Sequence, residues 1–162
     1  MGFYDKAIEL EKQAQEYYRK LCDQCADNEG LRNILKILSG DHRHHERILN
    51  EMKDGACQEK PGSDSYPRVV NIFREIKRKK QDFQCDMDLL QLYKEGLEFT
   101  REKLNFYENA LEQLTCEKDK NLLKQVIKEE QNQVYVLEDI LEMVRRPDTW
   151  VENAEFYHFE DY

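Results

Sequence analysis

Three of the four histidines of this chain lie between positions 42 and 45, inside a segment whose apolar residues have helical spacing. His42 and His45 belong to a run whose members follow one another at alternating steps of four and three, which places them on one face of a helix. The rest of this run is apolar and consists of Leu31, Leu35, Leu38, Leu49 and Met52. Two imidazoles in the middle of an apolar face, with Asp41 beside them, either bind a metal ion or form hydrogen bonds inside the core.

Three other segments with helical spacing are also interrupted by polar residues near their middle. Glu11 interrupts a stripe that otherwise consists of Tyr4, Ala7, Ala14, Tyr18, Leu21 and Cys25. Thr100 interrupts a stripe of Leu90, Tyr93, Leu97, Leu104, Tyr107, Leu111 and Leu114. Glu130 and Gln133 interrupt a stripe of Leu123, Val126, Leu137, Ile140 and Val144. Because Glu11 and His45 lie almost equally far from the turn between their helices, the four interruptions are expected to meet in one layer.

These stripes predict an all-α protein, in agreement with a charged fraction of 36% and only six glycines and three prolines. The architecture expected is a four-helix bundle of two helical hairpins, joined by a long crossover that contains a short helix beginning at Pro67. We expect the bundle to occupy residues 1–146, with its crossover at 54–85, and the tail at 147–162 to pack on it. Three long helices are predicted at 3–26, 31–53 and 86–115. A fourth is predicted to follow the turn at 116–119 and to end at about 146.

The two predicted hairpins resemble each other as internal repeats. Asn33-Ile-Leu-Lys36 matches Asn121-Leu-Leu-Lys124. The same offset aligns His42 with Glu130 and His45 with Gln133. The repeat therefore supports a bundle in which the polar residues of both hairpins occupy equivalent positions.

The composition excludes several classes of partner. A formal net charge of −9 argues against binding to nucleic acid, because phosphate recognition needs a basic face and the one basic run, Lys77–Lys80, reads as a solvated helix end. No apolar stretch is long enough to span a membrane, and no signal-peptide core is present, so a cytoplasmic protein is expected. Five scattered cysteines argue against a disulfide framework, and Cys22 and Cys25, although spaced like a redox pair, fall inside a predicted helix.

In their order and phase these motifs resemble the rubrerythrin-like branch of the ferritin-like superfamily. In that architecture two helices each supply a Glu, and each of the other two supplies a Glu-x-x-His, to a pair of metal ions. The segment from Glu11 to Tyr18 is similar to the first of the four helices. His42 and His45 resemble the second motif with its Glu replaced by His. Thr100 stands where the third helix carries its Glu. In the fourth motif, Glu130 is kept and Gln133 replaces the His.

The resemblance implies a depleted metal site. A ligand set of Glu11, His42, His45 and Glu130 mixes imidazole and carboxylate and suits one iron or zinc ion better than two. Gln133 offers only a weak carbonyl ligand. In an alternative register, Asp41 and His44 would form the second motif, but the spacing of the flanking leucines favours His42 and His45. Glu98 and Glu102 lie about 200° of helical rotation away from Thr100 and do not replace it.

Three functions follow from the resemblance. The first is an iron-dependent oxidoreductase that reacts with peroxide or dioxygen, with Tyr18 and Tyr107 orienting the carboxylates and a separate redox partner protein supplying electrons. The second is a protein that binds one metal ion without turnover. The third is a catalytically inactive bundle that acts as a structural or protein-interaction module. An acidic bundle with an aromatic tail is also compatible with a homodimer.

Overall fold

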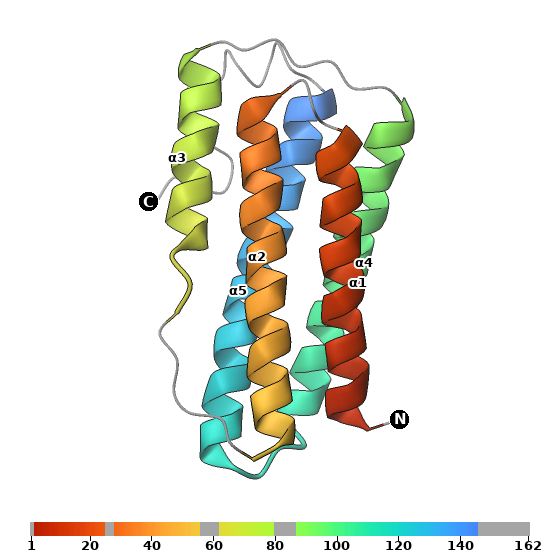
Figure 1. Ribbon diagram of the computed structural model, residues 1–162, viewed down its shortest axis with the longest axis vertical. Helices are drawn as coiled ribbons and strands as arrows, with labels where there is room; N and C mark the ends of the chain where they lie inside the picture. The colour runs from red at the N-terminus through yellow and green to blue at the C-terminus, as the bar shows by residue number, and fades with distance from the viewer. Residues whose placement is uncertain (1, 25–27, 56–61, 80–86, 146–162) are drawn as a thin grey trace.

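The computed structural model describes residues 2–24, 28–55, 62–79 and 87–145. Within these ranges the chain forms five helices and no strand (Figure 1). They are α1 (Phe3–Gln24), α2 (Glu29–Lys53), α3 (Ser65–Arg78), α4 (Met87–Leu111) and α5 (Glu117–Arg145).

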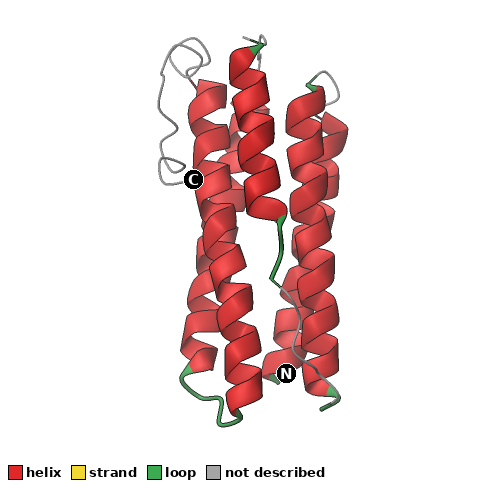
Figure 2. Ribbon diagram, turned by 90° about the vertical axis from the view of Figure 1, so that its left-hand side faces the viewer, coloured by secondary structure: helices red, strands yellow, loops and turns green. Residues whose placement is uncertain are grey.

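The four long helices form a bundle of two antiparallel hairpins. Helix α1 pairs with α2, and α4 pairs with α5. The hairpins meet where α1 contacts α4 and α2 contacts α5, and α3 packs outside the bundle against α2 and α5. Figures 1 and 2 show the long helices aligned along one axis, with α3 beside them over about half their length. The predicted all-α, ferritin-like bundle is therefore confirmed.

Local chemistry explains where the helices begin and end. The side chain of Asn28 accepts a hydrogen bond from the backbone N–H of Leu31 at 2.9 Å, so this cap starts α2 at Glu29, two residues before the predicted start. After α2, Gly55 adopts a φ of +69°, a conformation that glycine tolerates best. Helix α3 begins at Ser65, which places Pro67 in the first turn, where its missing N–H costs nothing.

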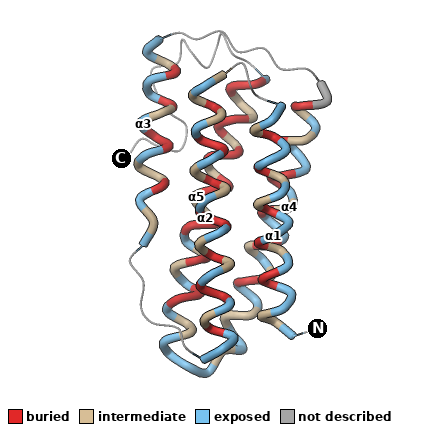
Figure 3. The backbone as a smooth tube through the Cα atoms, in the orientation of Figure 1, coloured by how far each residue is buried: buried red, intermediate tan, exposed pale blue. Residues whose placement is uncertain are grey.

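The predicted apolar stripes are buried on α2 and α5 along their whole length (Figure 3). On α4 the predicted stripe is only partly buried: the structure buries Lys103 and leaves Leu104 half-buried. Leu90 and Leu111 are also only half-buried. The inward face of α4 is therefore rotated slightly from the predicted stripe.

The core consists of two apolar clusters with a polar layer between them. One cluster surrounds Leu38 and Leu137, and the other surrounds Leu49 and Val126. Because His42 and His45 lie between Leu38 and Leu49 on the same face of α2, the polar layer is enclosed by apolar side chains on both sides. His42 and His45 are thus shielded from bulk solvent.

Some predictions concern residues outside the described ranges. These include the packing of the tail at 147–162 and the surroundings of Cys25, Cys57 and Cys85. Cys22 is half-buried, with its thiol 3.9 Å from the carbonyl oxygen of Arg32. Among the described residues, no helix combines the length and the apolar character needed to cross a membrane.

Two helical glycines should respond in opposite ways to substitution by alanine. A Cβ on Gly40 would meet no atom within 4 Å, so Gly40→Ala should raise the free energy of unfolding by about 0.5–1 kcal/mol through helix propensity. A Cβ on Gly96 would lie 1.9 Å from the Tyr17 hydroxyl, which donates to the carbonyl of Leu92. Displacing that ring should make Gly96→Ala destabilising by about 1–2 kcal/mol. Urea unfolding of both variants tests this, and stabilisation by Gly96→Ala would contradict the close contact of α1 with α4.

Asp139 on α5 should make stability depend on pH. Its Oδ2 has no hydrogen-bond partner among the described residues, and burial, followed by the charges of Glu138 and Glu142, raises the pKa of Asp139 to about 7. Between the unfolded value of 3.8 and about 7 the folded state binds the extra proton, so stability falls as pH rises through this range. Asp139→Asn should therefore stabilise the protein by on the order of 2 kcal/mol at pH 8 and have little effect at pH 4. Urea unfolding at both pH values tests this, with the exposed Glu108→Gln as control. An equal effect at both pH values would contradict the assignment.

Candidate metal centre

Four buried side chains from three helices converge in the polar layer. Glu11 comes from α1, His42 and His45 from α2, and Glu130 from α5. One ligand atom from each lies within 4.8 Å of the others, and no side chain of the four is more than 1% exposed. The 42 and 45 register predicted from the leucines is thus the one that faces the core. Asp41 instead accepts hydrogen bonds from serines of the crossover.

The two imidazoles present the same nitrogen to the centre. His42 Nδ1 lies 2.7 Å from Glu11 Oε2, and His45 Nδ1 lies 3.1 Å from Glu130 Oε1. On the outer side, His42 Nε2 is 2.6 Å from Gln133 Oε1 and His45 Nε2 is 2.7 Å from Glu129 Oε2. Histidines that bind metals commonly donate their other N–H to an acceptor that fixes the ring in this way. Both rings are therefore oriented as metal-binding histidines are.

Gln133 and Glu129 differ from what the sequence predicted. Gln133 was expected to offer a weak carbonyl ligand, but its Oε1 accepts from His42 and, at 3.2 Å, from the hydroxyl of Tyr18. Glu129, which lies beside the predicted stripe, contacts His45 and accepts the backbone N–H of Ser63 at 2.7 Å. Its carboxylate lies one helical position from Glu130, at the edge of the inward face.

Lys103 is the main member of the polar layer that the sequence did not predict. Its side chain is 2% exposed, and its Nζ lies 2.9 Å from Glu130 Oε1, 3.2 Å from Glu11 Oε1 and 3.1 Å from His42 Nδ1. The spacing was visible, because Lys103 is three residues after Thr100 and four before Tyr107, both of which face inward. Lysine is so rarely buried that its residue type predicts a solvent-exposed side chain at position 103.

The charges in the layer stabilise one another. Burial alone would raise the pKa of Glu11, but the ammonium of Lys103 and the ring of His42 hold this pKa well below its usual range. Burial would lower the pKa of His45, but Glu129, Glu130 and Glu11 raise it to about 10. Glu11 and Glu130 also raise the pKa of Lys103 against the effect of burial. In the metal-free protein, the raised pKa values of His45 and Lys103 favour their charged forms, which offset part of the negative charge of the three carboxylates.

The two tyrosines have different roles. Tyr107 donates to Glu11 Oε1 at 2.5 Å, which is the carboxylate contact predicted for it. Tyr18 was predicted to orient a carboxylate too, but it donates to Gln133 and stacks on His42, with ring centroids 5.2 Å apart. Tyr18 therefore positions an imidazole and the amide that holds it.

The donor set fits one metal ion and does not fit two. Thr100 donates its hydroxyl to the carbonyl of Gly96 at 2.8 Å, within its own helix, and Gln133 is engaged with His42. Lys103 fills the space between Glu11 and Glu130 on the side of α4. By contrast, Glu130 Oε2 is buried without a partner among the described residues, so one oxygen remains for an ion beside the imidazoles.

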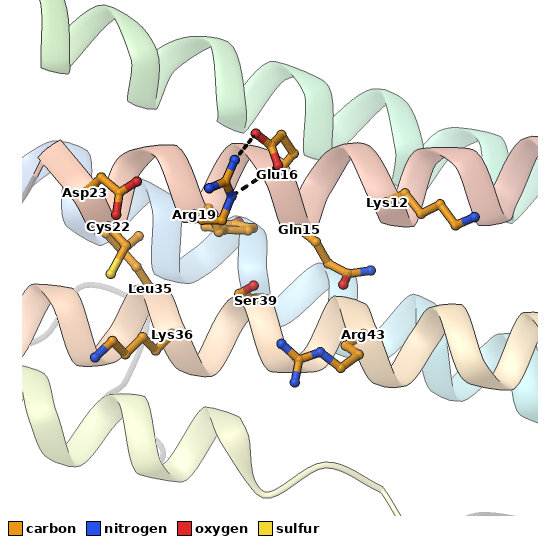
Figure 4. A pocket seen from close by; sticks show the side chains of 11 residues that line it. Lys12, Gln15, Glu16, Arg19, Cys22, Asp23, Leu35, Lys36, Ser39 and Arg43 are labelled. Atoms are coloured by element: carbon orange, nitrogen blue, oxygen red, sulfur yellow. Dashed lines mark hydrogen bonds and ion pairs between the residues drawn. The ribbon is translucent and has the colours of Figure 1, made fainter.

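Among the described residues, a groove and a small cavity lie on opposite sides of the layer. A groove of about 610 Å³ between α1 and α2 carries Lys12, Arg19, Lys36 and Arg43, with Arg19 paired to Glu16 (Figure 4). On the other side, a cavity of about 20 Å³, room for about one water, is lined by the acidic groups of Asp41 and Glu129 and the hydroxyl of Ser63 together with apolar side chains such as Leu38 and Val69. Electrostatics favours the approach of a cation from this second side.

An all-helical bundle of two hairpins, with Glu and His side chains converging in its core, defines a ferritin-like protein with a cluster suited to metal binding. The family model described as Rubrerythrin matches residues 3–141, which contain α1 to α4 and most of α5. The chain belongs to the rubrerythrin family. Comparisons with curated proteins and with solved structures gave no match.

Removing the hydroxyl of Tyr107 should destabilise the polar layer. Tyr107→Phe deletes a buried hydrogen bond to the charged Glu11, so the free energy of unfolding should fall by about 1.5–3 kcal/mol. Tyr135→Phe is the control, since the Tyr135 hydroxyl is only part-buried and contacts the neutral Gln131 on its own helix. Urea unfolding measures both. Equal losses in the two variants would show that Tyr107 contributes no charge-assisted bond.

Proposed function

We propose that this protein binds a single divalent transition-metal ion, iron or zinc, through Glu11, His42, His45 and Glu130. The observation that carries the proposal is the convergence of these four buried side chains, with ligand atoms within 4.8 Å of one another. Two imidazoles and two carboxylates form a mixed donor set that suits ferrous iron and zinc, whereas calcium and magnesium prefer oxygen ligands alone.

The surrounding residues support this assignment because they fix the proposed ligands before an ion arrives. Gln133 and Glu129 orient the two rings, and Tyr107 holds the carboxylate of Glu11. Such outer hydrogen bonds commonly contribute 10- to 100-fold to metal affinity. The centre is therefore preorganised for an ion rather than assembled by it.

The chemistry that follows depends on the metal. Bound iron would supply redox chemistry towards peroxide or dioxygen, with electrons from an external redox partner protein, and bound zinc would be redox-inactive. We propose reduced or altered oxidoreductase chemistry relative to a two-metal centre, because Thr100 supplies no carboxylate and Gln133 no imidazole. The residues of this chain would then bind and orient the ion and keep water from it.

Metal titration tests the proposal directly. Metal-free protein titrated calorimetrically with Zn²⁺, and with Co²⁺ as a visible probe, should bind one ion per chain. Glu11→Gln and His45→Gln should each weaken binding by roughly 100-fold, at or beyond the effect of losing an outer hydrogen bond. His44→Gln is the matched control, because His44 is a half-buried neighbour outside the cluster.

The titration also separates the second candidate function, a catalytically inactive structural or protein-interaction module. That candidate is favoured by the ion pairs of Lys103 with Glu11 and Glu130, which stabilise the layer without any metal. Circular dichroism of each variant establishes that it is folded. Folded wild-type protein that binds neither ion would overturn metal binding and leave the inactive module. Equal loss in His44→Gln and His45→Gln would overturn the ligand assignment.

A further inference from the structure

We infer that the ammonium of Lys103 serves as a built-in second cation of this centre, so that one metal ion and one ammonium occupy the layer together. The part of this inference that concerns metal stoichiometry rests on the proposed function. The part that concerns charge compensation by Lys103 stands on the ion pairs alone and is tested without metal.

The two oxygens of the Glu11 carboxylate have different partners. Its Oε2 lies 2.7 Å from His42 Nδ1 and 3.9 Å from His45 Nδ1, on the side of the imidazoles. Its Oε1 lies 3.2 Å from Lys103 Nζ, which is also 3.1 Å from His42 Nδ1, and accepts the hydroxyl of Tyr107. A carboxylate that bridges two cations uses one oxygen for each. Glu11 has this arrangement, with Lys103 as the cation on one side.

The two oxygens of the Glu130 carboxylate also differ in their partners. Its Oε1 lies 2.9 Å from Lys103 Nζ and 3.1 Å from His45 Nδ1. Its Oε2 is buried and has no partner among the described residues. An ion beside the imidazoles can therefore gain an oxygen of Glu130 while the bond to Lys103 is kept.

The formal charges match one divalent ion. Glu11, Glu129 and Glu130 are the carboxylates that contact the two histidines, and they carry three negative charges. One divalent ion together with the Lys103 ammonium carries three positive charges, since a histidine that binds a metal does so as the neutral ring. A second divalent ion would leave a large positive excess in a layer closed to water, which is strongly unfavourable.

The first experiment measures charge compensation in metal-free protein. Lys103→Met keeps the length of the side chain and removes its charge, so the midpoint of thermal unfolding should fall by roughly 10 °C. In a Glu130→Gln background the same substitution should cost less than half as much, because one of the two paired carboxylates is already neutral. Lys94→Met, at an exposed lysine of the same helix, is the control and should leave the midpoint nearly unchanged.

The second experiment titrates the same variants with Zn²⁺. Wild type and Lys94→Met should bind one ion per chain and take up no second ion in excess metal. Lys103→Met should bind Zn²⁺ at least 10-fold more tightly, because the two carboxylates then lack their resident cation. Should Lys103→Met alone fail to fold, the Lys103→Met/Glu130→Gln protein, in which less charge is unpaired, should fold.

The outcomes distinguish this inference from the proposed function. Two ions per wild-type chain, or identical midpoints for Lys103→Met and Lys94→Met, would overturn the role of Lys103. Equal affinity in Lys103→Met and Lys94→Met would overturn it as well, as would a double variant that also fails to fold. No Zn²⁺ binding by any variant would overturn the proposed function and the one-ion stoichiometry, while the metal-free measurements would still decide whether Lys103 compensates the carboxylates.

Discussion

The middle of this bundle depends on one constraint, the neutralisation of carboxylates that no water can reach. Glu11 and Glu130 are fully buried on different helices, and each would be strongly destabilising if left alone. The cations that compensate them come from the other two long helices, His45 from α2 and Lys103 from α4. All four helices must therefore be in place before the layer is stable.

This constraint links the site to the fold. The apolar clusters above and below the layer supply the driving force for association, but apolar side chains tolerate several packings. A layer of directional bonds, such as those of Tyr107 with Glu11 and of His45 with Glu129, forms in one register only. The polar layer thus specifies the alignment of the two hairpins, and the clusters stabilise it.

The sequence predicted the bundle and most of the cluster because both follow from periodicity. The stripe on α2 placed His42 and His45 inward, and equal distances from a turn brought Glu11 to their height. Lys103 could not be predicted in the same way. Positions 103 and 104 differ by about 100° of rotation, and both continue a stripe through Thr100, so residue type favoured Leu104. The ion pairs that reverse this preference join residues far apart in the sequence and become visible only in the folded bundle.

The departures from the family's motif are therefore connected rather than independent losses. Thr100 removes a carboxylate from α4, and Lys103, one turn later, adds an ammonium to the same face. Together with His42, which stands where the family's second motif has a Glu, they make the layer less negative than the family's motif would. Gln133 no longer supplies an imidazole, but its amide oxygen orients the ring of His42. Within the cluster, Oε2 of Glu130 is a buried carboxylate oxygen without a partner among the described residues, and it belongs to the group of side chains whose ligand atoms converge.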